Sequence, residues 1–184
     1  MCLEKYFCML FDLLRESKQV MKDNSAALEV IRKNLVKADE TLGVAESVTA
    51  GNLQAELSLA KNAIDFFHGG LTLYNTGQKA RHLLVDPIIA ERTNCVSDRV
   101  AQSMAVGACI FFTSDWGIGI TGYAAPVPEW NVKDTMFAWY SIAYRGAVMV
   151  TKKMEIKKGA MDKIQLFYVR TVLDDFSSLL KNRK

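Results

Sequence analysis

The chain has 184 residues, of which 50% are hydrophobic and 23% are charged, and its formal net charge is +3. This length is typical of one domain with a sizeable core, and the composition is that of globular rather than disordered proteins. So small a net charge argues against nucleic-acid binding, and no apolar run reaches the roughly 18 residues of a membrane span. We therefore expect a single domain over residues 1–184, with neither nucleic acid nor a membrane as its partner.

The four cysteines, Cys2, Cys8, Cys95 and Cys109, have no C-x-x-C spacing and no histidine cluster beside them. Neither a zinc site nor a redox motif is indicated by this pattern. Free thiols are typical of a reducing compartment, so the sequence predicts a cytoplasmic protein with no bound metal.

The first 22 residues are predicted to form a helical extension of the core domain. Charges follow its short apolar run and no small-residue cleavage site appears, so a signal peptide is not indicated. One helical face carries apolar residues, namely Leu3, Tyr6, Phe7, Leu10, Leu13 and Leu14. This face needs a covering surface, which either the same domain or a partner subunit could provide.

The rest of the chain alternates between helical and strand patterns. In chain order these are a helix capped near Asn24 or Ser25, strand 41–47, helix 51–61, strand 69–77, a helix after Gln78, a short helix opened by Pro87, a helix capped by Ser97, strand 116–122, a hairpin turning at Arg145 and Gly146, and a last helix over 160–180. Helices interleaved with strands favour a partly parallel sheet covered on both faces, and the late hairpin adds an antiparallel pair. The predicted fold is α/β, a three-layer α/β/α sandwich with a mixed, mostly parallel sheet.

Three predicted strands end in small polar loops, "AESVTAG", "LYNTGQK" and "ITGYAAP". Ligands of open α/β sheets bind beyond the carboxyl ends of the strands, so these loops are the candidate site. A serine within reach of a lysine can act as a nucleophile when burial lowers the pKa of the amine. Structural alternatives stay open: helix capping for Ser47 and Thr49, a strand aromatic for Tyr74, and a solvated helix residue for Lys79.

The chain resembles the C-terminal domain of the CinA family, the competence-damage-inducible proteins, through four motifs between Thr41 and Pro126. "AESVTAG" is similar to the family's A-E-S-C-T-G-G, and "GGLTLYNTGQK" to GG-V-x-Y-S-N-E-A-K. "NCVSDRVAQSMAVGA" is similar to GAVSEEVAxxMAxGA, and "WGIGITGYAAP" to IGI-x-x-T-G-I-A-G-P. The resemblance implies a nicotinamide mononucleotide amidohydrolase, which releases ammonia from the carboxamide and uses no metal and no organic cofactor.

By position, the resemblance implies that Lys79, Tyr74 and Ser47 are catalytic, with the Lys79 amine assisting proton transfer. It implies that the substrate is bound by Glu46, Thr49, Gly51, Asn75, Thr121 and Gly122. A pyridine nucleotide is the implied small-molecule ligand. The apolar first helix and the aromatic-rich "FAWYSIAY" segment favour a homodimer or another homo-oligomer, although burial within one subunit explains both features equally well.

The chain departs from the family pattern at positions that bear on this chemistry. Ala63 and Ile64 stand where the family carries P-G-S-S, whose serines include the expected nucleophile. Beyond Pro126, "VPEW" replaces a glycine-rich run, and "KGAMDK" lacks an expected arginine unless Lys158 or Lys163 serves instead. Three alternatives follow: an active amidohydrolase, an impaired member that binds pyridine nucleotides or serves in assembly, and an enzyme for another amide with a repositioned nucleophile. A hydroxyl within about 3.2 Å of the Lys79 amine would favour activity.

Overall fold

The computed structural model describes residues 26–183. After a helix over residues 26–38, the elements in chain order are β1 (Leu42–Glu46), α2 (Asn52–Ser58), the 3₁₀ turn η1 (Ala63–Asp65), β2 (Phe67–Thr72), α3 (Thr76–Leu83), α4 (Pro87–Arg92), α5 (Asp98–Phe112), β3 (Trp116–Gly122), the 3₁₀ turn η2 (Pro128–Trp130), β4 (Thr135–Tyr144), β5 (Ala147–Lys157) and α6 (Met161–Lys181). The extension predicted over residues 1–22 and the caps predicted at Asn24 and Ser25 lie outside the described residues.

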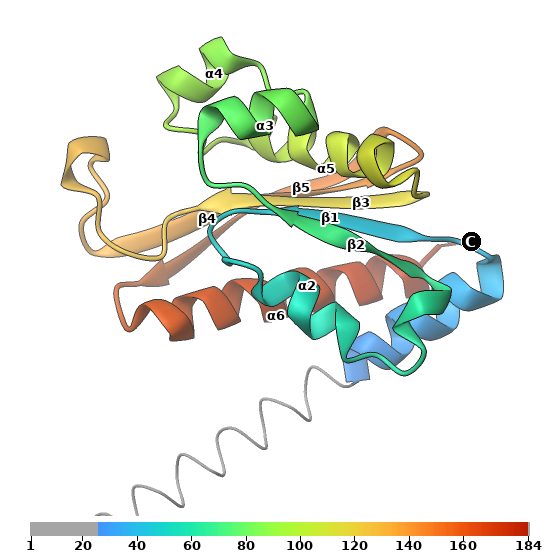
Figure 1. The fold of residues 1–184 in the computed structure, drawn as a ribbon. Coiled ribbons are helices and arrows are strands. Elements are labelled where there is room, and N and C mark those ends of the chain that lie inside the picture. Colours follow the sequence, from blue (N-terminus) through green and yellow to red (C-terminus); the bar gives the residue numbers. More distant parts are fainter. Residues whose placement is uncertain (1–25, 184) are drawn as a thin grey trace, which may run out of the picture.

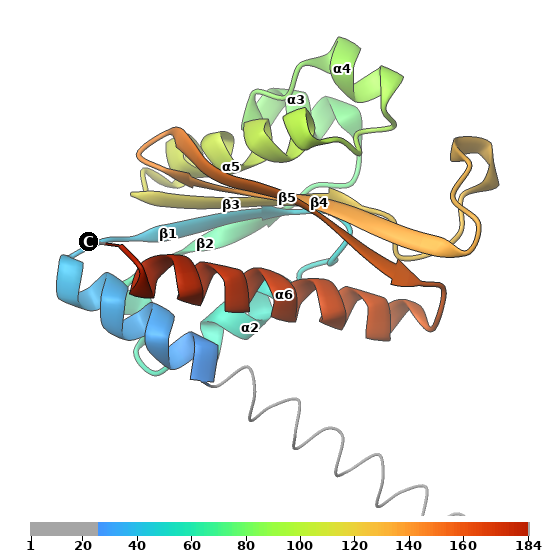
Figure 2. The same cartoon turned by 180° about the vertical axis from the view of Figure 1, so that it is seen from behind.

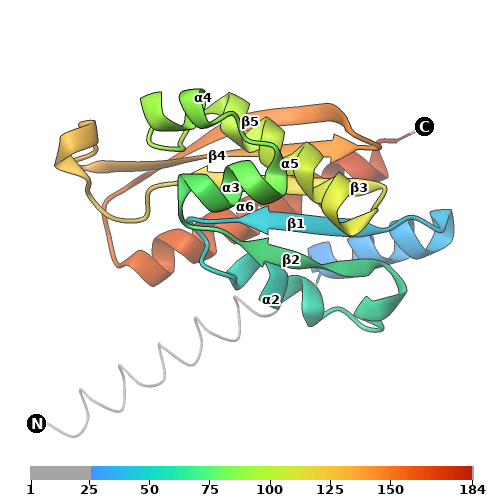
Figure 3. The ribbon, with the colours of Figure 1, turned by 45° about the horizontal axis from the view of Figure 1, so that its top comes forward.

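The strands form one five-stranded sheet in the order β2-β1-β3-β4-β5 (Figure 1). β1 pairs in parallel with β2 and with β3, whereas the β3–β4 and β4–β5 pairs are antiparallel. Glu46, the last residue of β1, lies opposite both Thr72 and Ile120. The carboxyl ends of β1, β2 and β3 therefore meet at the same edge of the sheet, and Figure 3 shows β1 and β2 pointing toward the side where the chain leaves for α2 and α3.

Helices cover both faces of the sheet. The helix over residues 26–38, α2 and α6 lie on one face, and α3, α4 and α5 lie on the other (Figures 1 and 2). The larger hydrophobic cluster joins the sheet to α6 through buried residues that include Trp116, Tyr140, Tyr168 and Phe176. The predicted three-layer α/β/α sandwich with a mixed sheet is confirmed, but its strand pairs are divided equally between parallel and antiparallel instead of being mostly parallel. None of the helices described for residues 26–183 is both long and apolar enough to span a membrane.

Glycines in β3 allow α5 to approach the sheet closely. A Cβ atom on Gly117 would lie 2.1 Å from the carbonyl oxygen of Ala105, and one on Gly119 would lie 2.4 Å from the Ala105 nitrogen. Ser97 begins α5 as predicted, because its hydroxyl accepts a hydrogen bond from the Val100 N–H at 3.2 Å. The cap and the glycines together hold α5 across the sheet, and the loop before α5 contributes to the site described below.

The end of one predicted strand differs from the structure. β2 ends at Thr72 instead of continuing to Gly77, because the Asn75 side chain accepts a hydrogen bond from Gln78 N at 2.9 Å and begins α3. An asparagine cap thus ends a pattern that alternates like a strand. The hairpin turn at Arg145 and Gly146 is confirmed, with φ angles of 49° and 78°.

Candidate functional site

The β1–α2 loop is organised around the carboxylate of Glu46, which is fully buried. Its Oε2 accepts hydrogen bonds from the Thr49 hydroxyl at 2.6 Å and from Leu53 N at 3.1 Å. Its Oε1 accepts from the backbone and side-chain nitrogens of Gln54 at 3.1 and 3.0 Å. A carboxylate at the start of a helix satisfies N–H groups that have no partner within the helix. Glu46 and Thr49, predicted to bind substrate, thus make these hydrogen bonds within their own loop.

Two hydroxyls meet where β1 and β3 end. Ser47 Oγ donates a hydrogen bond to Thr121 Oγ1 at 3.3 Å, and Thr121 Oγ1 donates to the Cys95 carbonyl oxygen at 2.7 Å. Both side chains are buried, and Cys95 lies in the loop between α4 and α5. The structure therefore brings together two of the predicted site residues and adds a third segment that the sequence had not indicated.

Lys79 lies on α3 and is 2% exposed, so the solvated alternative does not apply. Burial lowers the pKa of its amine, because a charged ammonium is poorly solvated there, while the neighbouring Cys95 acts in the opposite direction. Within residues 26–183, no side chain or carbonyl forms a hydrogen bond with this amine. The hydroxyl that would favour the amidohydrolase is therefore not within hydrogen-bond distance of Lys79.

Cys95, predicted from the sequence only as one of four free thiols, adjoins the site. It is 6% exposed, and its Sγ lies 3.0 Å from the Thr76 hydroxyl at the start of α3. The contact between Cys95 and Thr76 is created by packing of α3 against the loop between α4 and α5, so nothing in the local sequence indicates it. Across residues 26–183 no group of three or more histidine, cysteine or acidic side chains is arranged to hold a metal ion.

The remaining predicted residues have other surroundings. Tyr74 is 69% exposed, and Asn75 caps α3. Gly51 precedes α2 with φ 99°, a conformation that L-residues with side chains rarely adopt. A Cβ atom on Gly122 would lie 2.5 Å from Ala138, so this glycine permits close packing between β3 and β4. These four residues shape or border the loops, and none of them contacts Lys79 through a side-chain hydrogen bond in the described chain.

Ala63 and Ile64, which replace the family's serines, lie in η1 immediately before β2. Lys79 lies on α3, which follows β2, so the six residues of that strand, roughly 20 Å of extended chain, separate the two places. Figure 1 shows η1 and α3 at opposite ends of β2, and Ile64 is 88% exposed. A hydroxyl at either position would therefore not contact the Lys79 amine of the same subunit.

The loop after β3 begins inside the protein and then projects from it. Tyr123 is 8% exposed, and its hydroxyl accepts a hydrogen bond from Asn94 Nδ2 at 3.1 Å. Val127 and Val132 then pair as an isolated bridge, and η2 extends beyond the sheet (Figures 1 and 2). Trp130 in η2 is 44% exposed. The tip of this loop is thus directed outward, whereas its first residues adjoin the segment that carries Cys95.

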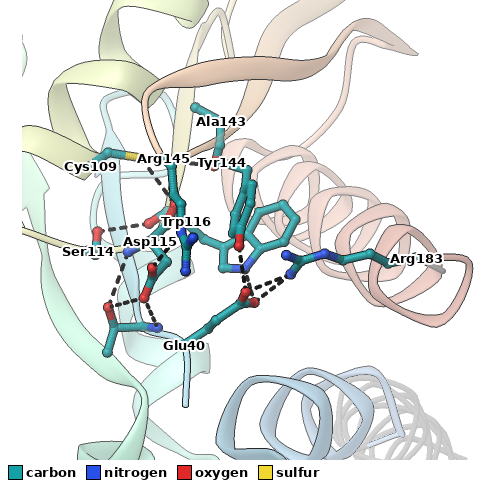
Figure 4. Close-up of polar contacts among 10 residues, drawn as sticks. Glu40, Cys109, Ser114, Asp115, Trp116, Ala143, Tyr144, Arg145 and Arg183 are labelled. Atoms are coloured by element: carbon teal, nitrogen blue, oxygen red, sulfur yellow. Dashed lines mark hydrogen bonds and ion pairs between the residues drawn. The ribbon is translucent and has the colours of Figure 1, made fainter. Parts of the chain in front are cut away.

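A second polar cluster lies at the opposite end of β1 and β3 (Figure 4). The Glu40 carboxylate accepts hydrogen bonds from Trp116 Nε1 and the Tyr144 hydroxyl, each at 2.8 Å, and from Arg183 at 2.6 and 2.8 Å. Burial alone would raise the pKa of Glu40, but these donors outweigh it and lower the pKa. The Arg183 guanidinium also lies over the Tyr144 ring at 4.2 Å. This cluster fastens the end of α6 to the sheet and has a structural role.

Comparisons with known proteins agree with this fold. A family model described as the CinA C-terminal domain matches residues 24–180. A CinA-like protein of Picosynechococcus sp. is 40% identical over 111 residues, which are 60% of this chain and 26% of that protein. One of Chlorobium chlorochromatii is 30% identical over 156 residues, which are 85% of this chain and 37% of that protein. The chain thus spans well under half the length of these curated relatives.

Solved structures extend the likeness to three dimensions. The competence or damage-inducible protein from Enterobacter asburiae superposes with a TM-score of 0.78 at 25% identity, covering 85% of this chain and 98% of that chain. A competence-damaged protein (CinA) superfamily protein from Escherichia coli gives a TM-score of 0.74 at 27% identity, covering 88% and 89%. The range matched by the family model, residues 24–180, includes every residue of the candidate site from Glu46 to Thr121.

Proposed function

The chain belongs to the CinA family through its C-terminal domain, and from this premise we propose that it hydrolyses the carboxamide of nicotinamide mononucleotide or a related pyridine nucleotide. The observation that carries the proposal is Lys79, which is 2% exposed as a residue and whose amine forms no hydrogen bond with another group of residues 26–183. Burying an amine without a hydrogen-bond partner costs free energy, and packing alone does not explain why a lysine occupies this position. A buried amine with a lowered pKa is well suited to act as a general base near neutral pH.

In the proposed reaction, the neutral Lys79 amine takes a proton from the nucleophile as it attacks the carboxamide carbon. The resulting ammonium then returns the proton to the departing nitrogen, and the C–N bond breaks to release ammonia. Ser47 is one of the residues predicted from the sequence to be catalytic, and its hydroxyl donates a hydrogen bond to Thr121. Water completes the reaction, so carboxamide and water yield the carboxylic acid and ammonia.

A second function is favoured by one observation, namely that no hydroxyl in residues 26–183 forms a hydrogen bond with Lys79. A protein that binds the pyridine nucleotide without hydrolysing it would not need such a bond. In this alternative the loops after β1 and β3 supply binding contacts only. The homo-oligomer predicted from the sequence also stays a proposal, and light scattering of the full chain would measure its mass.

Both functions are tested by incubating the full chain with nicotinamide mononucleotide, following ammonia release, and measuring thermal stabilisation by the substrate and by the acid product. We expect ammonia release that falls by about 10² to 10⁴ in Lys79→Met. Lys61→Met, at an exposed lysine, is the matched control and should keep the full rate. Stabilisation without ammonia would establish the binding function instead. If neither ammonia release nor thermal stabilisation is observed, both functions are refuted. An unchanged rate in Lys79→Met would refute the assignment of Lys79 as the base.

A further inference from the structure

The hydroxyl of Ser47 is poorly placed to use Lys79 as its base. Its proton is directed to Thr121 Oγ1, and Thr121 in turn donates to the carbonyl of Cys95. Neither hydroxyl forms a hydrogen bond with the Lys79 amine. A serine nucleophile needs a base that accepts its proton directly, and these hydrogen bonds direct the Ser47 proton to Thr121 instead of to Lys79.

The thiol of Cys95 faces the same side of α3 as the Lys79 amine. Thr76 and Lys79 are three residues apart on α3, so their side chains share one face of that helix. Thr76 contacts Cys95 Sγ at 3.0 Å, and Cys95 is near enough to Lys79 to oppose the effect of burial, which lowers the pKa of the Lys79 amine. As whole residues, Cys95 is 6% exposed and Lys79 is 2% exposed. The Cys95 thiol therefore contacts the face of α3 that carries Lys79, whose amine forms no hydrogen bond with another group of residues 26–183.

The backbone holds this thiol in an unusual turn. Asn94 and Cys95 have φ angles of 48° and 60°, the left-handed region that residues with side chains seldom occupy. The turn is fixed by hydrogen bonds from Cys95 N to the Ala90 carbonyl at 2.7 Å and from Val96 N to the Thr93 carbonyl at 2.9 Å. Such conformations persist where surrounding contacts impose them, and they are frequent at functional sites.

From this arrangement we propose that the Cys95 thiol, with the Lys79 amine as its base, is the nucleophile of the site. For a carboxamide, where the inference rests on the proposed function, the S–H proton passes to Lys79 as the C–S bond forms and the carbonyl π pair moves to oxygen. The C–N bond then breaks, and the nitrogen takes the proton from Lys79 and leaves as ammonia. Water cleaves the thioester, which yields the carboxylic acid and restores the thiol.

One test needs no turnover. Full-length protein is treated with iodoacetamide at neutral pH, and the alkylation of each cysteine is followed by peptide mass spectrometry. Cys109 is the internal control, because it is also buried and its thiol lies near two carbonyl oxygens. We expect Cys95 to react at least ~10-fold faster than Cys109, and Lys79→Met to remove most of that difference. Equal rates for the two thiols would refute the proposal, and Thr76→Val provides a second, milder perturbation of the same pair.

A second test uses nicotinamide mononucleotide. We expect Cys95→Ala to lower ammonia release by ~100-fold or more, the matched control Cys109→Ala to retain most of it, and hydroxylamine to trap an acyl group from Cys95. Full turnover in Cys95→Ala would refute the thiol nucleophile and leave the proposed function standing. Lys79-dependent alkylation of Cys95 without ammonia release from the wild-type chain would refute the proposed function and leave the thiol–amine pair standing.

Discussion

Replacing Glu46 with alanine is expected to lower the free energy of unfolding by about 3 to 5 kcal/mol. The carboxylate accepts four hydrogen bonds, two of them from the backbone N–H groups of Leu53 and Gln54 in the first turn of α2. These groups have no acceptor within the helix, so alanine leaves them unsatisfied. Each hydrogen bond to a charged acceptor contributes about 1.5 to 3 kcal/mol, but bonds that share one carboxylate are not additive.

The assay is urea unfolding of the wild-type chain, Glu46→Ala and the matched variant Thr49→Val. Thr49→Val removes one of the four donors and is expected to cost about 1 to 2 kcal/mol. In a thermal scan, Glu46→Ala should unfold roughly 10 °C below the wild-type chain, given about 2 to 4 °C per kcal/mol at this size. If Glu46→Ala unfolds like the wild-type chain and loses only pyridine-nucleotide binding, the capping role assigned to Glu46 is wrong and the substrate-binding role predicted from the sequence is right.

Three further changes test other parts of the structure. Burial lowers the pKa of Lys79, so between that lowered pKa and the ordinary 10.5 the unfolded chain binds more protons than the folded chain. The free energy of unfolding therefore rises with pH in this range. Lys79→Met should abolish this rise and increase the free energy of unfolding at pH 7 by about 1 to 3 kcal/mol, measured by urea titration. Because the pKa of Glu40 is lowered, its contribution to the free energy of unfolding is present above pH 4.5, its ordinary pKa, and is lost as pH falls through the lowered pKa. Arg183→Ala should weaken this loss of stability in acid, which unfolding measured between pH 3 and 7 would show. Gly119→Ala would place a Cβ atom 2.4 Å from Ala105 N and is expected to cost at least ~3 kcal/mol or prevent folding, which circular dichroism would show.

The secondary structure was largely predictable because its signals are local. Ser97 capped α5 and Pro87 opened α4 as the sequence indicated, since caps and proline act through neighbouring backbone groups. The end of β2 was misplaced because the side chains through Leu73 and Tyr74 alternate like those of a strand. The hydrogen bond from Gln78 N to the Asn75 side chain begins α3 and ends the strand earlier than this alternation predicts.

Part of the candidate site was also predictable. The carboxyl ends of neighbouring parallel strands converge whatever loop follows them, so the meeting of Ser47 with Thr121, 74 positions apart, follows from the strand pattern. The strand pattern did not predict that Tyr74 is exposed, or that Ile64 lies at the end of β2 opposite to α3. An aligned motif gives the order of residues along the chain, and it does not say at which end of a strand each one lies.

The sequence by itself determined the class of fold and, through four motifs in order, the family, because hydrophobic periodicity, caps and turns depend on residues close together in the chain. Only the tertiary structure decided the chemistry available to Lys79. Its burial lowers the pKa of its amine, and its thiol neighbour Cys95 comes from a separate loop. Desolvation and charge interactions depend on which groups surround an atom in space, and here packing between α3 and the loop before α5 brings those groups together.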